Sequence, residues 1–331
     1  MLGLILFIVS TLGLMIVLLF GSRLGWLSPT IIILAIVAIV AYVAFVMWEK
    51  KQANPFIDFG LFKNTTFTGA TISNFLVNAT IGLMMVSQQL IQIAGFKADG
   101  TNYTPWDAGL LTLGYAVFII AFIRIGEKLL QRFGPRKPMI WANLIVIASC
   151  VLLMLTHLLI GEYVILAIIA YSLFGLGLAF YATPSTDAAL SNLPADQAGS
   201  GSGIYKMASS LGGAIGAAIS LAVFTGLSQA DAQAIGNVID WTGRTDNVAI
   251  RLAGMVAIGV NMLFAVLAIL SIVMTVPKGG GSRDKGKVEA TADPKPQLTP
   301  DEESKTQVLE QLRELPVDEL QRLAQQALGK K

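Results

Sequence analysis

The sequence predicts an all-α integral membrane protein whose chain crosses the bilayer as eight transmembrane helices. Of its 331 residues, 54% are hydrophobic and only 13% are charged, whereas about 25% of the residues in a soluble domain are charged. The apolar runs have the length of a membrane-spanning helix, about 20 residues, and lack the short alternating pattern of a membrane β-barrel. Both observations indicate a bundle of helices embedded in the lipid bilayer.

The apolar spans follow one another along the chain. They cover residues 2–20, 29–48, 66–93, 108–125, 139–158, 162–192, 200–227 and 251–276. Met1 leads into the first span without the basic start and the cleavage region of a signal peptide, so we expect this span to be retained. Spans six and seven exceed the roughly 20 residues needed to cross a bilayer, and Pro184 is the expected site of a bend. Spans three to eight allow a three-plus-three arrangement, 66–158 and 162–276.

Basic residues gather in the connections that follow the even-numbered spans. They are Lys50, Lys51 and Lys63 after span two, Lys128, Arg132, Arg136 and Lys137 after span four, and Lys278, Arg283, Lys285 and Lys287 after span eight. Because basic loops remain in the cytoplasm, we expect a multi-pass protein of a bacterial-type plasma membrane with both termini in the cytoplasm.

These features divide the chain into five parts. Residues 1–50 form a transmembrane helix pair, 51–65 a cytoplasmic connection, 66–277 a six-helix bundle, 278–298 a flexible linker and 299–331 a cytoplasmic amphipathic helical tail. The tail begins with a helix-capping sequence at Thr299 and carries a leucine stripe that Pro316 interrupts. We expect the tail either to dock on a partner or on the membrane surface, or to form a short surface helical hairpin, and the hairpin is favoured.

Few residues could support catalysis or bind a metal. The chain has one cysteine, Cys150, and one histidine, His157, which can form neither an internal disulfide nor a metal site by themselves. No nucleophile, base and metal ligands converge in the sequence, so we expect no enzymatic activity and no cofactor. A net charge of +2 gives no reason to expect nucleic-acid binding.

Spans six and seven flank a turn centred on residues 194–199, and we expect them to fold back on each other as a hairpin. Asp187 and Lys206 are equidistant from this turn. An isolated charge at membrane depth is costly, while a paired one is tolerated. We therefore predict an ion pair between Asp187 and Lys206 at the inner mouth. Gly212 and Gly216 favour close helix packing within the protein rather than a dimer face.

Polar side chains on apolar helices should face protein or water instead of lipid. The predicted substrate cavity is lined by Asn74, Asn78, Gln88, Gln89, Tyr171, Tyr181 and Asn261. The alternative is that these groups only form hydrogen bonds between helices. At mid-depth of spans three to eight the sequence has no Asp, Glu or His to carry a proton, and Asp187 is the best remaining candidate, although a structural role is favoured for it.

The connection between spans four and five resembles a loop motif of the major facilitator superfamily, Gly-x-Leu-Ala-Asp-Arg-x-Gly-Arg-Arg/Lys. Arg132, Gly134 and Arg136 match the motif, while Gln131 stands where the family has Asp. The residues assigned to this cytoplasmic loop motif are Arg124, Glu127, Arg132, Gly134, Arg136 and Lys137. On a helix face, Arg124 and Glu127 could partly replace the missing carboxylate. The alternative is that the basic residues only set the topology.

Five longer stretches extend the resemblance over residues 1–277. They are Asn54–Asn64, Gln89–Gly95, Trp106–Leu111, Ala182–Asp187 and Gly203–Ser210. Together they resemble the C-terminal portion of a fourteen-helix drug:proton antiporter of the quinolone-resistance type. The resemblance implies a linking helix pair followed by the C-terminal six-helix bundle, and export of small amphipathic drugs against inward proton flow.

The resemblance also implies an N-terminal transporter half that this chain lacks, so we expect the chain not to be competent alone. The alternative function is a non-transporting membrane scaffold that binds a partner through its cytoplasmic C-terminal helices.

Overall fold

The computed structural model describes residues 2–25, 27–52, 59–97, 99–158, 160–194, 197–228, 241–243 and 246–279. The predicted tail at 299–331, and the predicted linker beyond residue 279, lie outside these residues. Within them, the chain is almost entirely helical and contains no β-strand. The predicted all-α class is confirmed.

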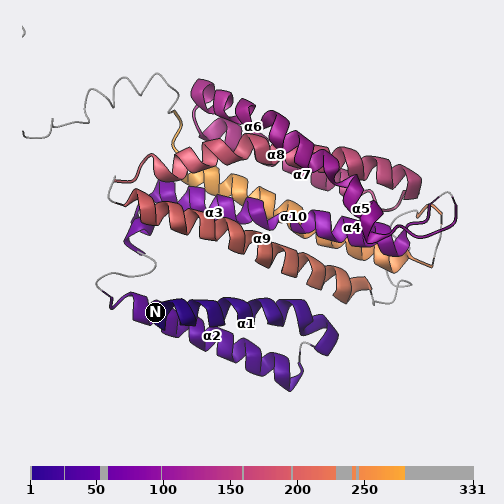
Figure 1. Cartoon of the computed structure of the whole chain (residues 1–331), viewed down its shortest axis with the longest axis horizontal. Helices are drawn as coiled ribbons and strands as arrows, with labels where there is room; N and C mark the ends of the chain where they lie inside the picture. The colour runs from indigo at the N-terminus through magenta and orange to yellow at the C-terminus, as the bar shows by residue number, and fades with distance from the viewer. Residues whose placement is uncertain are drawn as a thin grey trace, which may run out of the picture. The chain divides into compact units, whose positions relative to one another are not determined.

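The helices follow the predicted spans closely (Figure 1). They are α1 (Leu2–Leu24), α2 (Pro29–Glu49), η1 (Phe59–Lys63), α3 (Thr65–Ala79), α4 (Gly82–Ala94), α5 (Pro105–Leu111), α6 (Leu113–Phe133), α7 (Arg136–Leu153), α8 (Ile160–Leu190), α9 (Ala198–Ser228) and α10 (Val248–Thr275). Seven segments of the described chain are long and apolar enough to cross a membrane, with α3–α4 and α5–α6 each counting as one. The eighth predicted span is α1, of which the shorter stretch Gly3–Leu18 is apolar.

Local sequence explains where several helices begin and end. The Asn64 side chain caps α3 by accepting hydrogen bonds from the backbone N–H groups of Thr66 and Phe67, both at 3.0 Å. At the end of α6, Gly134 adopts a φ of 71° and donates its N–H to the Leu130 carbonyl at 2.8 Å. A side chain at this φ would be strained, so glycine permits the tight turn into α7. Helix α8 continues through Pro184.

The six-span bundle is built from two similar groups of contacts. Helix α8 packs along α6 and α7, and α3 packs along α9 and α10. Each group therefore joins the first span of one half of the bundle to the second and third spans of the other half. This is the contact pattern that an inverted three-plus-three arrangement predicts. Helices α1 and α2 pair with each other, and α1 also contacts α9.

The predicted hairpin of spans six and seven is correct only near its turn. Helices α8 and α9 share few contacts, and α3 and α10 lie between α9 and the α6–α8 group (Figure 1). The two arms touch near the turn, where the Tyr205 hydroxyl donates a hydrogen bond to Ser185 Oγ at 2.7 Å. Farther from the turn the arms separate because each has a larger packing surface on a different neighbour.

Glycines bring the backbones of the paired helices close together. A Cβ atom added at Gly212 would lie 2.9 Å from the carbonyl carbon of Phe75, and one at Gly216 would lie 2.6 Å from that of Ala79. Both neighbours belong to α3. Gly175 of α8 meets the backbone of Tyr115 on α6 in the same way. The expected role of Gly212 and Gly216 in packing within the protein is confirmed.

Candidate substrate site

A cavity of about 180 Å³ lies among α3, α6, α8 and α9. Three of the seven predicted cavity residues, Asn74, Asn78 and Tyr181, are found in its wall. The other lining residues are Ile119, Ile123, Leu178, Ala179, Ala182, Thr186, Tyr205, Lys206 and Ser209. The cavity therefore combines an aliphatic wall with amide, phenol, hydroxyl and ammonium groups, which is a composition typical of small-molecule sites.

The two amides of this cavity are held in fixed positions. Asn74 is buried and donates its Nδ2 to the backbone carbonyl of Tyr205 at 3.0 Å. Asn78 donates its own Nδ2 to the Asn74 carbonyl and to Asn74 Oδ1, at 2.8 and 2.9 Å. A bond from α3 to the α9 backbone thus orients both amides.

Two buried phenols complete the polar part of the wall. The Tyr181 and Ser73 hydroxyls lie 2.6 Å apart, and Tyr205 donates to Ser185 as described above. These bonds join α8 to α3 and to α9 beside the cavity. Buried hydroxyl groups with partners lose little free energy on burial, so the network can position the wall without destabilising the bundle.

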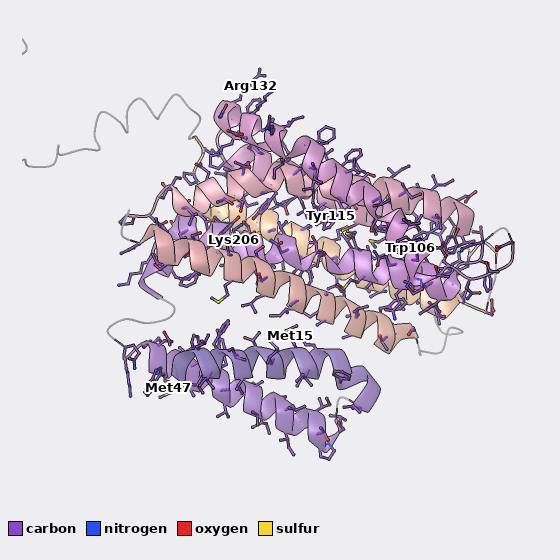
Figure 2. All side chains as sticks on the ribbon, viewed as in Figure 1. Met15, Met47, Trp106, Tyr115, Arg132 and Lys206 are labelled. Carbon is purple, nitrogen blue, oxygen red and sulfur yellow. The ribbon has the colours of Figure 1, made fainter. Side chains whose placement is uncertain are left out.

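Lys206 is the charged residue among those that line the cavity. It is exposed and lies near the same end of the bundle as Arg132, with Trp106 at the opposite end (Figure 2). We call the end that carries Arg132, Arg136 and Lys137 the basic end. Asp187 is half-buried on α8 and does not line the cavity, whereas its neighbour Thr186 does. The ion pair between Asp187 and Lys206 stays a prediction.

The other four predicted cavity residues lie elsewhere. Asn261 is fully buried on α10 and bonds to Ser220 on α9, with its Nδ2 2.9 Å from Ser220 Oγ. Tyr171 is fully buried and donates to Ser87 at 2.9 Å. Gln88 and Gln89 are half-buried on α4, outside the cavity wall. For Asn261 and Tyr171 the structure supports the alternative that we considered, hydrogen bonding between helices.

The loop motif lies at the turn from α6 to α7. Arg136 donates to the carbonyl of Val273 at 2.8 Å, which ties this loop to the end of α10. Glu127 accepts a hydrogen bond from Gln131, the residue in place of the motif's Asp, at 3.5 Å. Arg124 is exposed on α6. The remaining assigned residues, Arg132 and Lys137, place their cationic groups 5.2 and 5.8 Å from the Phe133 ring centre.

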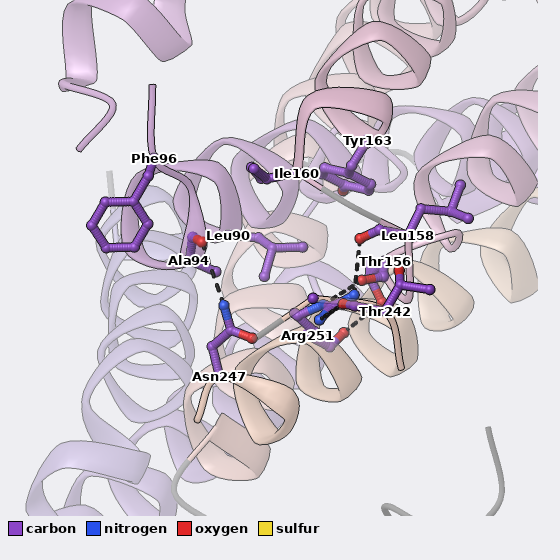
Figure 3. A pocket seen from close by; sticks show the side chains of 11 residues that line it. Leu90, Ala94, Phe96, Thr156, Leu158, Ile160, Tyr163, Thr242, Asn247 and Arg251 are labelled. Carbon is purple, nitrogen blue, oxygen red and sulfur yellow. Dashed lines mark hydrogen bonds between the residues drawn. The ribbon is translucent and has the colours of Figure 1, made fainter. Parts of the chain in front are cut away.

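Sequence reasoning missed the role of Arg251. This residue starts α10 at the end opposite the basic end and is only 6% exposed. Its guanidinium donates hydrogen bonds to the carbonyls of Thr156, Leu158 and Thr242, at 2.6, 2.9 and 2.9 Å (Figure 3). A second cavity of about 200 Å³ lies beside it. Arg251 therefore connects α10 to the α7–α8 turn, and an arginine at the start of an apolar span was its only sequence signal.

The buried charged groups of the described bundle lie close to helix ends. Among the described residues, Glu49 and Arg251 are the buried side chains that carry a charge. The described residues include no group of three or more metal-ligating side chains. In the loop before α5, Lys97 forms an ion pair with Asp107 at 2.6 Å, and this bond raises the pKa of Lys97. The mid-depth of the described bundle thus contains no buried carboxylate.

The fold and the cavity define a class: a polytopic helical membrane protein with a partly polar cavity inside its bundle. The family model for the Major Facilitator Superfamily matches residues 1–217. The chain belongs to this superfamily.

Curated relatives include the quinolone resistance protein NorB of Staphylococcus aureus strains MRSA252, COL and bovine RF122 / ET3-1. Each is 41% identical over 276 residues, which covers 83% of this chain and 55% of the relative. The chain therefore spans little more than half the length of these relatives.

Proposed function

We propose that this chain is the C-terminal part of a proton-coupled multidrug exporter that moves small amphipathic drugs out of the cell. The observation that carries the proposal is the cavity among α3, α6, α8 and α9, with polar groups inside a bundle of membrane-spanning helices. Membership of the facilitator superfamily and the likeness to quinolone resistance proteins support a drug as the ligand.

The cavity becomes complete only with a complementary N-terminal half, on the same or on another polypeptide. Its volume of about 180 Å³ is below the roughly 300–1,000 Å³ of drug sites. On α6, beside the cavity, Val117 is 58% exposed and Ile120 is 76% exposed. We infer that the complementary half packs on this side of α6 and supplies the remainder of the drug site.

The proposal places the basic end in the cytoplasm. Arg132 and Lys137 are exposed there, and basic loops are retained on the cytoplasmic side of a membrane. The proton carrier belongs to the complementary half, because proton coupling requires a titratable group that faces an internal cavity. The cavity wall described here contains no carboxylate and no histidine.

Dye efflux tests the proposed function. Cells should be loaded with a fluorescent amphipathic dye while they produce this chain alone, a matched N-terminal half alone, or both. We expect net efflux only when both halves are present, and we expect a protonophore to abolish it. Equal membrane levels of the chain in each strain are the control. Efflux by the chain alone would contradict the need for a second half, and no efflux in any strain would contradict the proposed transport.

A further inference from the structure

The cavity wall has an asymmetric charge. Lys206 contributes an ammonium group, and no aspartate or glutamate is among the lining residues. Lys206 is exposed, but a charge at the edge of a protein cavity still acts on a bound ligand, because the effective dielectric constant near a protein surface is lower than in bulk water. The wall should therefore attract a ligand anion and repel a ligand cation.

The neutral polar groups of the wall are largely committed to one another. Asn74 bonds to the backbone of α9, Asn78 bonds to Asn74, and the Tyr205 hydroxyl bonds to Ser185. Thr186 donates to the carbonyl of Ala182 at 2.9 Å. A neutral acceptor of a ligand would have to displace one of these donors from its present bond, whereas an anion gains the attraction of the Lys206 charge without breaking them.

The aliphatic part of the cavity wall is suited to a flat ring. It consists of Ile119 and Ile123 of α6 and Leu178 of α8. A volume of about 180 Å³ accommodates only part of a drug-sized molecule, since complete drug sites are roughly 300 Å³ or larger. The part that fits is a ring edge that carries one polar substituent.

We propose that Lys206 binds the carboxylate of an aromatic drug, so that this cavity selects carboxylate-bearing substrates over their uncharged or cationic analogues. The inference rests on the proposed function and names the substrate class of the same site. Lys206 acts as a specificity residue through a charge-assisted contact, which is stronger than a neutral hydrogen bond.

Asp187 is the neighbouring carboxylate with which a ligand would compete. It is half-buried on α8, and it is Thr186, not Asp187, that lines the cavity. If Lys206 serves the ligand, exchanging the two charges (Asp187→Lys with Lys206→Asp) should abolish the preference for a carboxylate even where the protein still folds. If Lys206 serves only as the ion-pair partner of Asp187, the exchange should leave ligand preference unchanged.

The test is ligand binding to the purified full chain together with its matched N-terminal half in lipid nanodiscs. The probes are a fluorescent quinolone carboxylate and its methyl ester, which keeps the ring system and the basic amine but has no anion. We expect the chain to bind the carboxylate about tenfold more tightly than the ester, as for one hydrogen bond to a charged group. Lys206→Met should bring this ratio close to one, Lys206→Arg should preserve it, and Lys206→Glu should reverse it.

Lys278→Met is the matched control, because Lys278 is an exposed lysine that follows α10 and lies outside the cavity wall. This variant should keep the tenfold ratio. Equal binding of the two probes by the unmodified chain, or an unchanged ratio in Lys206→Met, would overturn the role of Lys206 while leaving the cavity as a drug site. If neither probe binds, both the proposed drug site and its carboxylate selectivity are refuted.

Discussion

Replacing Gly216 with alanine should separate α9 from α3. The added Cβ would lie 2.6 Å from the carbonyl carbon of Ala79 and closer still to its oxygen, whereas carbon atoms in good contact are about 3.5–4.0 Å apart. The two helices must therefore move apart by about 1 Å at this point. Overpacking of this kind typically costs about 1–3 kcal/mol.

Gly213→Ala is the matched control for this prediction. Its Cβ would meet no atom closer than 3.9 Å, so the substitution adds the same methyl group to the same helix without a clash. Both variants gain the same helix propensity, about 1 kcal/mol, and this gain cancels when they are compared. The difference in stability between the two variants then measures the strain at the α3–α9 contact.

The measurement is the thermal unfolding of purified protein in detergent, followed by the loss of the monodisperse peak in size-exclusion chromatography. For a chain of this size we expect Gly216→Ala to melt roughly 2–10 °C below Gly213→Ala. Equal melting temperatures would show that α9 does not press on α3 as closely as the structure indicates, and the packing argument for Gly212 and Gly216 would be refuted.

Three further predictions concern polar contacts. Arg251→Met should destabilise the bundle by about 3 kcal/mol or more, because three backbone carbonyls lose a hydrogen-bond donor. Urea unfolding measures this loss of stability, and an unchanged midpoint of unfolding would contradict the role of Arg251. Tyr205→Phe removes the bond to Ser185 and should cost about 1 kcal/mol in the same assay, with wild-type stability as the refuting result. Asp187→Lys should lower the yield of folded protein, and the charge exchange with Lys206 should restore it; failure of that rescue counts against the predicted ion pair.

The membrane class and the spans could be predicted from composition because lipid is a uniform constraint. Every helix that crosses the lipid bilayer needs about 20 apolar residues. The hydropathy of the chain therefore predicts where the spans lie. The turn at Gly134 was also visible in the sequence, because a glycine and a proline mark it and few other residues adopt a φ of 71°.

The cavity could be predicted only in part. Asn74 and Asn78 were found because two amides one helical turn apart share a face of α3, and polar groups avoid lipid. The same rule selected Asn261 and Tyr171, which bond to neighbouring helices instead. Avoidance of lipid shows that a polar side chain faces protein, and it does not distinguish a cavity from a hydrogen bond.

The sequence by itself determined the positions of the apolar helices, the superfamily resemblance and the residues that must avoid lipid. Only the tertiary structure decided that α9 packs on α3 rather than along α8, that Tyr205 and Lys206 join Asn74 and Asn78 at one cavity, and that Arg251 secures the start of α10. The physical reason is that membrane helices are apolar on all sides. Hydropathy therefore indicates that a helix crosses the bilayer, while close contacts of small residues and a few hydrogen bonds select its neighbours.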